Sequence, residues 1–227
     1  MPNSTPAPAK AATPEPAARP DRRARRRQET IDEIVEIAEE VMAERGVNGL
    51  SLSEVARRLG VQPPALYKYF DSLAALYDEL FRRGHTEHLN QVREAMSGAE
   101  PGLEAVRAGL EASARWALTS RGVAQLAFWR PVPGFEPSPE AFAPSEEMVK
   151  VFRAGFADAV ALGQLGPAAD SDEACWLMST MLIGVISQAM ANEPDLPWGE
   201  GRFTPLLSTL LDTFPTIYPP KKPRRKR

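Results

Sequence analysis

Apolar residues recur every three or four positions along most of this chain, and that spacing predicts amphipathic helices. The first stretch covers residues 28–45, where one face is apolar and the other is rich in glutamate. The apolar stripe consists of Ile31, Ile34, Val35, Ala38, Val41 and Met42. Gly46 then ends the predicted helix, since glycine readily adopts the left-handed conformation that terminates helices. No strand-like alternation persists anywhere, so the pattern predicts an all-α fold.

Two short helices joined by a tight turn are predicted next. Ser51, followed three residues later by a glutamate, forms a capping box that starts a helix, and Gly60 supplies the turn. Pro64 suits the first position of the following helix, because its missing N–H would have no helical partner there. Leu66 and Phe70 anchor this second helix inward and leave polar and aromatic residues outside. Such a pair is typical of a helix-turn-helix, whose second helix enters the major groove of DNA.

A long helix is predicted over residues 72–96, because Asp71 and Ser72 provide a capping signal before another apolar stripe. It would join the helix-turn-helix head to a larger helical body. Helices in that body are predicted over residues 102–119, 121–129, 145–163, 171–192 and 202–214. The intervening segment 130–144 holds five prolines and is predicted to be irregular.

Charge is distributed unevenly along the chain, although the net charge is only −3. Residues 1–27 carry seven basic and two acidic side chains, whereas residues 28–218 are acidic overall. The predicted segments are a disordered basic arm (1–27), a helix-turn-helix domain (28–73), a helical regulatory and dimerisation domain (74–218) and a basic tail (219–227). We expect the arm to lie along phosphates or in the minor groove, because a DNA-binding motif follows it directly.

Cysteine usage and the N-terminal composition bear on localisation. Cys175 is the single cysteine, which excludes an internal disulfide and favours a reducing compartment. The proline-rich first residues lack the apolar core of a signal peptide, so a cytoplasmic location is expected. Residues 174–191 are uncharged and long enough to cross a bilayer. They contain four polar residues and have acidic flanks, so we interpret them as a helix buried on two sides of the protein.

The motif residues resemble a known family in their combined spacing. The matching positions are Gly46, Leu50, Ser51, Val55, Ala56, Leu59, Gly60, Val61, Leu66, Tyr67, Phe70 and Leu76. Over about 50 residues this pattern is similar to the DNA-binding domain of TetR-family transcriptional regulators. The segments 130–144 and 187–207 are similar to one subgroup of the variable C-terminal domains in that family.

The resemblance implies which residues of the head contact DNA. The positions carried over are Ser51, Ser53, Gln62, Pro63, Ala65, Tyr67, Lys68 and Tyr69. Among them, Tyr67 and Lys68 would contact phosphates, and Gln62 and Tyr69 could reach base edges. The partner implied is a palindromic double-stranded operator bound by a homodimer, most often for repression.

One departure from the family concerns the start of the long helix. Leu73 occupies a position where the family usually has a phosphate-binding lysine, and residues 28–73 carry a net charge of −5. The basic arm would therefore contribute more of the affinity, through Arg25, Arg26 and Arg27.

Residues 171–214 are expected to form the homodimer interface. The helix over 171–192 is apolar on more than one face, and Gly184 and neighbouring serines would allow a second backbone to approach. A second apolar stripe is formed by Phe203, Leu206, Leu207, Leu210, Leu211 and Phe214. Two such helices from each subunit would make a four-helix interface, unless both only close the core of one subunit.

A cavity for a small-molecule effector of unknown identity is expected in the body by family analogy alone. The candidate lining residues are Trp116, Phe128, Trp129, Phe142, Phe152, Phe156 and Trp176. Each of them could instead serve only in core packing. Their aromatic character favours an apolar or aromatic effector, and no cofactor is expected.

Two other functions compete with that of a transcriptional regulator. A metal enzyme would need more ligands than His85 and His88, which we interpret as part of a solvated helix face, so no metal site or catalytic residue is expected. The alternative is a helix-turn-helix protein-interaction module without specific DNA binding, which the acidic head and Leu73 favour.

Overall fold

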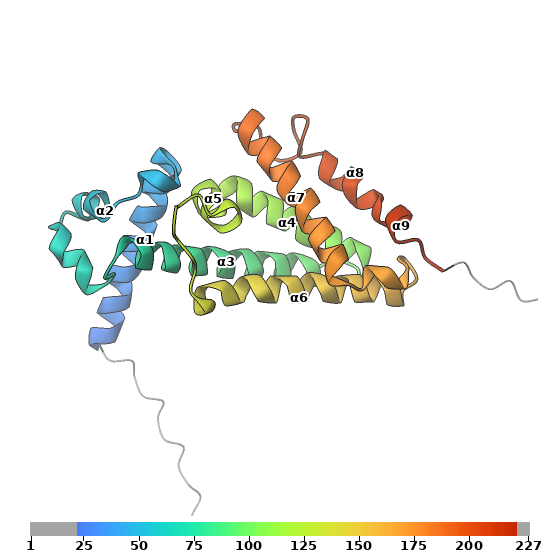
Figure 1. Ribbon diagram of the computed structural model, residues 1–227, viewed down its shortest axis with the longest axis horizontal. Coiled ribbons are helices and arrows are strands. Elements are labelled where there is room, and N and C mark those ends of the chain that lie inside the picture. Colours follow the sequence, from blue (N-terminus) through green and yellow to red (C-terminus); the bar gives the residue numbers. More distant parts are fainter. Residues whose placement is uncertain (1–21, 222–227) are drawn as a thin grey trace, which may run out of the picture.

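The computed structural model describes residues 22–221, and all regular elements in this range are helical. Figure 1 shows the N-terminal helices as a head at one end of the molecule and the remaining helices as a larger body beyond it. The head contains α1 (Arg22–Arg45), the 3-10 helix η1 (Val47–Gly49), α2 (Leu52–Leu59) and the 3-10 helix η2 (Pro63–Lys68). The body contains α3 (Leu73–Ser97), α4 (Leu103–Thr119), α5 (Arg121–Trp129), α6 (Pro139–Ala161), η3 (Pro167–Ala169), α7 (Asp172–Asn192), α8 (Leu206–Asp212) and α9 (Phe214–Ile217). The predicted all-α class, with a helix-turn-helix head and a helical body, is confirmed.

Helix α1 begins at Arg22, six residues before the predicted start. The prediction of a disordered arm through residue 27 is therefore wrong for residues 22–27, while residues 1–21 lie outside the described part. Arginine is a good helix former, and Arg25 pairs with Glu29 one turn later at 3.3 Å. Helix α1 thereby carries its basic residues on a rigid element.

Helix α6 begins at Pro139 and includes Pro144, so the prediction of an irregular segment through residue 144 is wrong. Ser138 caps the helix, because its Oγ accepts a hydrogen bond from the N–H of Ala141 at 3.1 Å. Asp78 of α3 fixes this cap by accepting bonds from the N–H and Oγ of Ser138, both at 2.7 Å. Proline at the first helical position loses no bond, and the helix tolerates the second proline while packed on α3 and α4.

The last predicted helix starts later than expected and is divided. Gly199 and Gly201 adopt positive φ angles of 84° and 80°, which keep the chain in turns until α8 begins at Leu206. The helix is interrupted at Thr213, between α8 and the short α9, and Pro215 in the first turn of α9 lacks the N–H that would continue the hydrogen bonding of α8.

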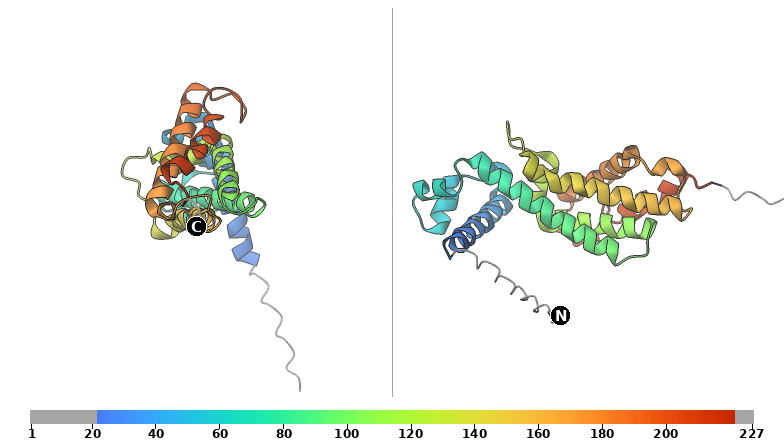
Figure 2. Two further views of the ribbon diagram at one scale, coloured as in Figure 1. Left: turned by 90° about the vertical axis from the view of Figure 1, so that its right-hand side faces the viewer. Right: turned by 90° about the horizontal axis from the view of Figure 1, so that it is seen from below.

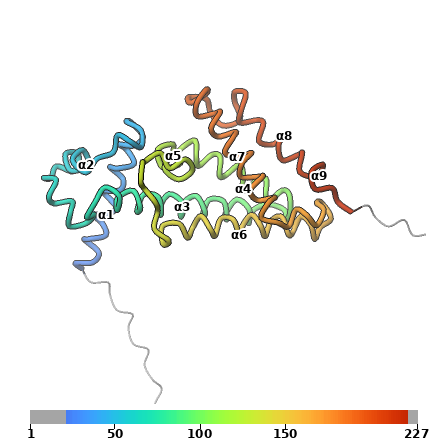
Figure 3. The backbone as a smooth tube through the Cα atoms, in the orientation of Figure 1, coloured from blue at the N-terminus to red at the C-terminus, as the bar shows by residue number. Residues whose placement is uncertain are grey.

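Helix α3 runs from the head into the body and packs along α4 and α6, as the views in Figures 2 and 3 also show. Helix α7 crosses α4 and α6, and α8 packs on α7. Among the described residues, α7 is the one helix long and apolar enough to cross a membrane. In this fold one of its faces packs on the body, so the expected burial on two sides is incomplete within one subunit.

The head and body share one continuous apolar core. The Tyr77 hydroxyl of α3 donates a 2.8 Å hydrogen bond to the carbonyl of Val47 in the head. Helix α5 touches α1 closely, since a Cβ placed at Gly122 would lie 2.8 Å from the Cβ of Met42. Both α3 and α5 therefore connect the head physically to the body.

Candidate functional site

Local sequence signals set the geometry of the helix-turn-helix. The Ser51 Oγ accepts a hydrogen bond from the N–H of Glu54 at 3.2 Å, so the predicted cap of α2 is present. Gly60 ends α2 in the left-handed region at φ 74°, where a side chain would be strained. Ser72 caps α3 through the N–H of Ala75 at 3.1 Å. Between these caps, the predicted second helix of the motif is a six-residue 3-10 helix, η2.

Element η2 separates inward and outward side chains as predicted. Leu66 is fully buried, whereas Tyr67 is 56% exposed and Lys68 and Gln62 are also exposed. Of the other predicted contact residues of the motif, Ser53 is exposed, and the rest are half-buried: Ser51, Pro63, Ala65 and Tyr69. The outward group is therefore free to meet a partner surface.

The basic turns of α1 lie directly beside η2. Arg27 donates a 2.8 Å hydrogen bond to the carbonyl of Lys68, and its guanidinium lies 5.2 Å from the centre of the Tyr69 ring. A concave surface results, lined by Arg23, Arg26, Arg27, Thr30, Lys68 and Tyr69. No acidic side chain belongs to this lining in the described residues, so the surface is suited to an anion. We call it the basic concavity.

Several other arginines of the head pair with its acidic residues. Arg57 and Arg58 both bond the carboxylate of Glu54, at 2.8 Å and 3.0 Å, and Arg45 reaches it at 3.0 Å. These arginines lower the pKa of Glu54 to about 2. Arg58 also bonds Glu44. The lining of the basic concavity, in contrast, combines several cations with no carboxylate among the described residues.

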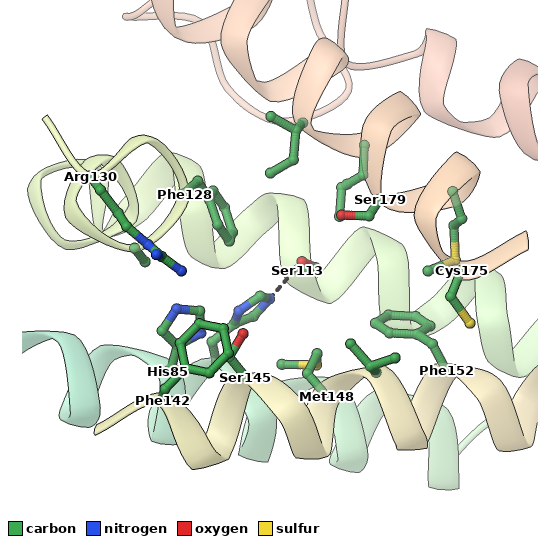
Figure 4. Close-up of a pocket in the computed structure, with 16 residues that line it drawn as sticks. His85, Ser113, Phe128, Arg130, Phe142, Ser145, Met148, Phe152, Cys175 and Ser179 are labelled. Atoms are coloured by element: carbon green, nitrogen blue, oxygen red, sulfur yellow. Dashed lines mark hydrogen bonds between the residues drawn. The ribbon is translucent and has the colours of Figure 1, made fainter. Parts of the chain in front are cut away.

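A second candidate site is a cavity of about 260 Å³ in the body, enclosed by α3, α4, α5, α6 and α7. Its polar lining residues are His85, His88, Ser113, Arg130, Ser145 and Ser179, and its apolar ones include Phe128, Phe142, Met148, Phe152, Met178 and Leu182. Val149 and Ser179 are solvent-exposed, which places an opening between α6 and α7. Figure 4 shows Arg130 and His85 toward one end, with Phe152 and Cys175 toward the other.

The two histidines are buried in this cavity wall, and the prediction of a solvated histidine face is wrong. His85 is 5% exposed and His88 is 4% exposed. Both continue the apolar stripe of α3, four and seven residues after Phe81, so helical geometry turns them inward. His88 stacks on Trp116 with ring centres 4.3 Å apart, and its Nε2 shares a 2.6 Å hydrogen bond with the Ser113 hydroxyl.

Burial keeps both imidazoles neutral at pH 7. It lowers the pKa of His85 to about 4, with a smaller effect from the nearby cationic Arg130. It lowers the pKa of His88 to about 3. The Ala127 carbonyl weakly opposes the His85 shift without reaching hydrogen-bond geometry. Both ring nitrogens of His85 and the Nδ1 of His88 consequently have no hydrogen-bond partner within residues 22–221.

Only some of the aromatic residues predicted to line the cavity do so in the structure. Phe128, Phe142 and Phe152 line the cavity. Trp116 is buried behind His88, Phe156 is buried against Phe214, and Trp129 borders a separate depression with Pro131 and Met190. Trp176 is 66% exposed, so the prediction that it lines the cavity is wrong. Its side of α7 faces away from α4 and α6.

Arg130 and the three serines of the wall were missed by the sequence reasoning. Arg130 follows α5 in the left-handed conformation at φ 45°, a placement that no local pattern signals. The histidines, in contrast, had a signal in their helical spacing from Phe81. Among the described residues no group of three or more His, Cys, Asp or Glu side chains could hold a metal ion.

The chain is similar to known proteins in both sequence and fold. The family described as "Bacterial regulatory proteins, tetR family" matches residues 34–80. The chain is 36% identical over 64 residues to the uncharacterized HTH-type transcriptional regulator YobS of Bacillus subtilis, covering 28% of this chain and 34% of that protein. It is 30% identical over 139 residues to the HTH-type transcriptional regulator Rv1816 of Mycobacterium tuberculosis, covering 60% and 58% of the two chains. The crystal structure of the TetR-family regulator PfmR from Thermus thermophilus has the same fold, with a TM-score of 0.63 at 23% identity over 80% of this chain and 96% of that one. The chain spans about a third to three fifths of the length of the curated relatives it matches.

Proposed function

Because this chain belongs to the TetR family of helix-turn-helix transcriptional regulators, we propose that it binds a palindromic DNA operator as a homodimer in the cytoplasm. The family consists of regulators and not of enzymes. We further propose that binding represses transcription and that a small effector in the body cavity releases the operator. The observation that carries the proposal is the basic concavity beside the exposed Tyr67 and Lys68.

The head supplies separate groups for position and for sequence. Lys68 and the arginines of α1 are cations on adjacent elements, and phosphate contacts of this kind provide most of the affinity. Gln62 is exposed at the start of η2 and can form two hydrogen bonds with an adenine in the major groove. Pro63 and Ala65 offer compact apolar surface to thymine methyl groups.

The uncovered face of α7 supports the homodimer. Trp176, Thr180, Gly184 and Gln188 follow one another along this face, and Trp176 is 66% exposed. No atom lies within 4 Å of a Cβ placed at Gly184, so a second helix can approach its backbone. Leu206 on α8 is 46% exposed and extends the apolar surface. Two copies would then pack four helices together and present two heads to two half-sites.

The proposed release by an effector depends on the two connections between cavity and head. Helix α3 carries His85 in the cavity wall and, about 12 Å earlier along its axis, Tyr77 bonded to Val47. Helix α5 carries Phe128 at the cavity and Gly122 against α1. An effector that favours a different placement of these helices would change the spacing between the two heads. Operator and effector would then weaken each other's binding by the same factor.

Selection of bound fragments from the host genome tests the DNA-binding proposal. We expect a palindromic motif to be enriched, and the double variant Tyr67→Ala/Lys68→Ala to bind it more than about tenfold more weakly. Lys150→Ala, which removes an exposed lysine on α6, serves as the matched control and should bind normally. Normal affinity of a correctly folded double variant would rule out this surface as the DNA-binding one.

The same selection addresses the protein-interaction alternative. The net charge of −5 over residues 28–73 and Leu73 at the start of α3 favour that alternative. It would be supported by the absence of any enriched fragment even at low salt, where weak electrostatic binding to DNA is strongest.

A further inference from the structure

We propose that the body cavity binds a small amphipathic acid, whose carboxylate lies between Arg130 and His85 and whose apolar part lies against Met148, Phe152 and Leu182. This inference rests on the proposed function only in regarding the cavity as the effector site. It goes further in stating the chemical class of the ligand.

The polar end of the cavity holds buried groups that lack partners. Both nitrogens of His85 and the Nδ1 of His88 are unpaired among the described residues, although each residue is at least 95% buried. A buried polar group left unpaired destabilises the protein, and a ligand that supplies the missing bond removes that penalty. A neutral imidazole carries one N–H, so His85 can donate to a ligand oxygen.

The charge of the cavity is positive, because Arg130 is its one ionised lining residue in the described part of the chain. Its guanidinium lies 5.2 Å from the centre of the Phe142 ring and 5.8 Å from that of Phe81. Arg130 forms no ion pair with any described residue, and no carboxylate belongs to the cavity lining. The side chain is exposed at the edge of the cavity, so its attraction for an anion is moderated by water.

The far end of the cavity favours a compact apolar group. Phe152 and Met178 are buried there, and burial raises the pKa of the Cys175 thiol, which therefore remains uncharged. The volume of about 260 Å³ lies just below the range of about 300–1,000 Å³ that is usual for small-molecule sites. One polar end and one apolar end, separated as Figure 4 shows, fit an acid with a short hydrocarbon or aromatic body.

The test compares acids with alcohols of the same carbon skeleton. Octanoate and 4-phenylbutyrate are titrated into the full-length chain by calorimetry near neutral pH, beside 1-octanol and 4-phenylbutanol. We expect each acid to bind about tenfold or more tightly than its alcohol, as a charge-assisted hydrogen bond implies. Arg130→Gln should remove this preference and leave alcohol affinity unchanged. The control variant Arg121→Gln alters an exposed arginine at the other end of α5, and it should retain the preference for acids over alcohols.

A second variant separates ligand contact from a structural role. His85→Phe keeps a ring in the wall but lacks the N–H donor, so it should weaken the acids several-fold more than the alcohols. If Arg130 only stabilises the C-terminus of α5, Arg130→Gln lowers the thermal midpoint and leaves the acid-to-alcohol ratio unchanged, which overturns the proposal.

Two further results would also overturn it: equal affinity for acids and alcohols, or no binding of either acid at millimolar concentration. Operator binding by the ligand-free chain is measured separately. Acids that bind without weakening operator binding would contradict the proposed release while leaving the ligand class intact.

Discussion

The head presents its candidate functional side chains to solvent, whereas the body encloses its own. Tyr67 is 56% exposed on η2, while His85 is 5% exposed in the cavity wall. A DNA surface is large and highly charged, so it meets a convex element flanked by cations. A small ligand is held by enclosure, which requires several helices to converge. The comparison indicates that the helix-turn-helix can be understood from one short segment, whereas the cavity requires elements that are distant in sequence.

The largest effect should come from the core where the two regions meet. Phe81 is fully buried and packs on Phe135, Phe142 and His85. We expect Phe81→Ala to lower the free energy of unfolding by about 3–5 kcal/mol, measured by urea denaturation. Ile217→Ala, at a 44% exposed site, should cost less than about 1 kcal/mol. Comparable losses for both would mean that Phe81 is not a core residue.

A smaller effect is expected from the hydrogen bond that joins the regions. Tyr77→Phe removes this bond, while the Val47 carbonyl keeps its 3.3 Å bond from the N–H of Leu50, so the change should cost about 0.5–1.5 kcal/mol. All four tryptophans lie at position 116 or later, so their fluorescence reports on the body, whereas circular dichroism reports on both regions. The unfolding transitions followed by fluorescence and by circular dichroism should coincide in the unmodified chain and separate in the variant.

Tyr67→Phe, which removes a solvent-exposed hydroxyl, is the matched control and should leave the transitions coincident. Coincident transitions in Tyr77→Phe as well, with unchanged stability, would show that this bond does not couple head and body.

The buried histidines predict a pH dependence specific to the body. Their pKa values are lowered from 6.5 to about 4 for His85 and about 3 for His88. Below about pH 6.5 the unfolded chain binds these protons and the folded chain does not, so stability decreases as the pH falls toward 4. Each histidine contributes up to about 1.4 kcal/mol per pH unit in that window.

This slope is checked by urea denaturation at several pH values between about 7 and 4.5. His88→Gln keeps a hydrogen-bonding group for Ser113. The free energy of unfolding of this variant should depend less steeply on pH, because it lacks the contribution of one buried histidine. Carboxylates such as Glu54 also lose their contribution at lower pH, but they do so equally in both chains. Identical slopes would show that His88 is not buried in its neutral form.

The smallest effect on folding, and one confined to the head, concerns Arg26. Arg26→Ala should change stability by less than about 0.5 kcal/mol, because the side chain lies on the surface. It should reduce the slope of log K against log salt for operator binding by about one. Arg202→Ala removes an exposed arginine paired with Glu193 in the body and should not alter that slope. An unaltered slope in Arg26→Ala would place the DNA away from the basic concavity.

The residues of the helix-turn-helix were predictable because their geometry is determined locally. Ser51, Gly60 and Ser72 act on groups within a few residues of themselves, and all three perform the predicted role. The start of α1 was mispredicted because residues 22–27 were assigned to a disordered DNA-binding arm, although arginine is a good helix former. Pro144 was mispredicted because the packing of α6 on α3 outweighs one missing hydrogen bond.

The cavity was only partly predictable. Phe128, Phe142 and Phe152 were identified as candidates by aromatic character, but the same criterion selected Trp176, which faces solvent. Arg130 belongs to the cavity because a left-handed residue follows α5 and turns the chain beside α3 and α6. No short-range pattern contains that information.

The sequence by itself determined the helical class, the position of the helix-turn-helix and which of its side chains point outward. These depend on periodicity, caps and turns, whose physical causes act over a few residues. The tertiary structure decided that the arginines of α1 stand beside Lys68, and that His85, His88 and Arg130 share one cavity. Those juxtapositions depend on how separate helices pack, and packing is a property of the whole core.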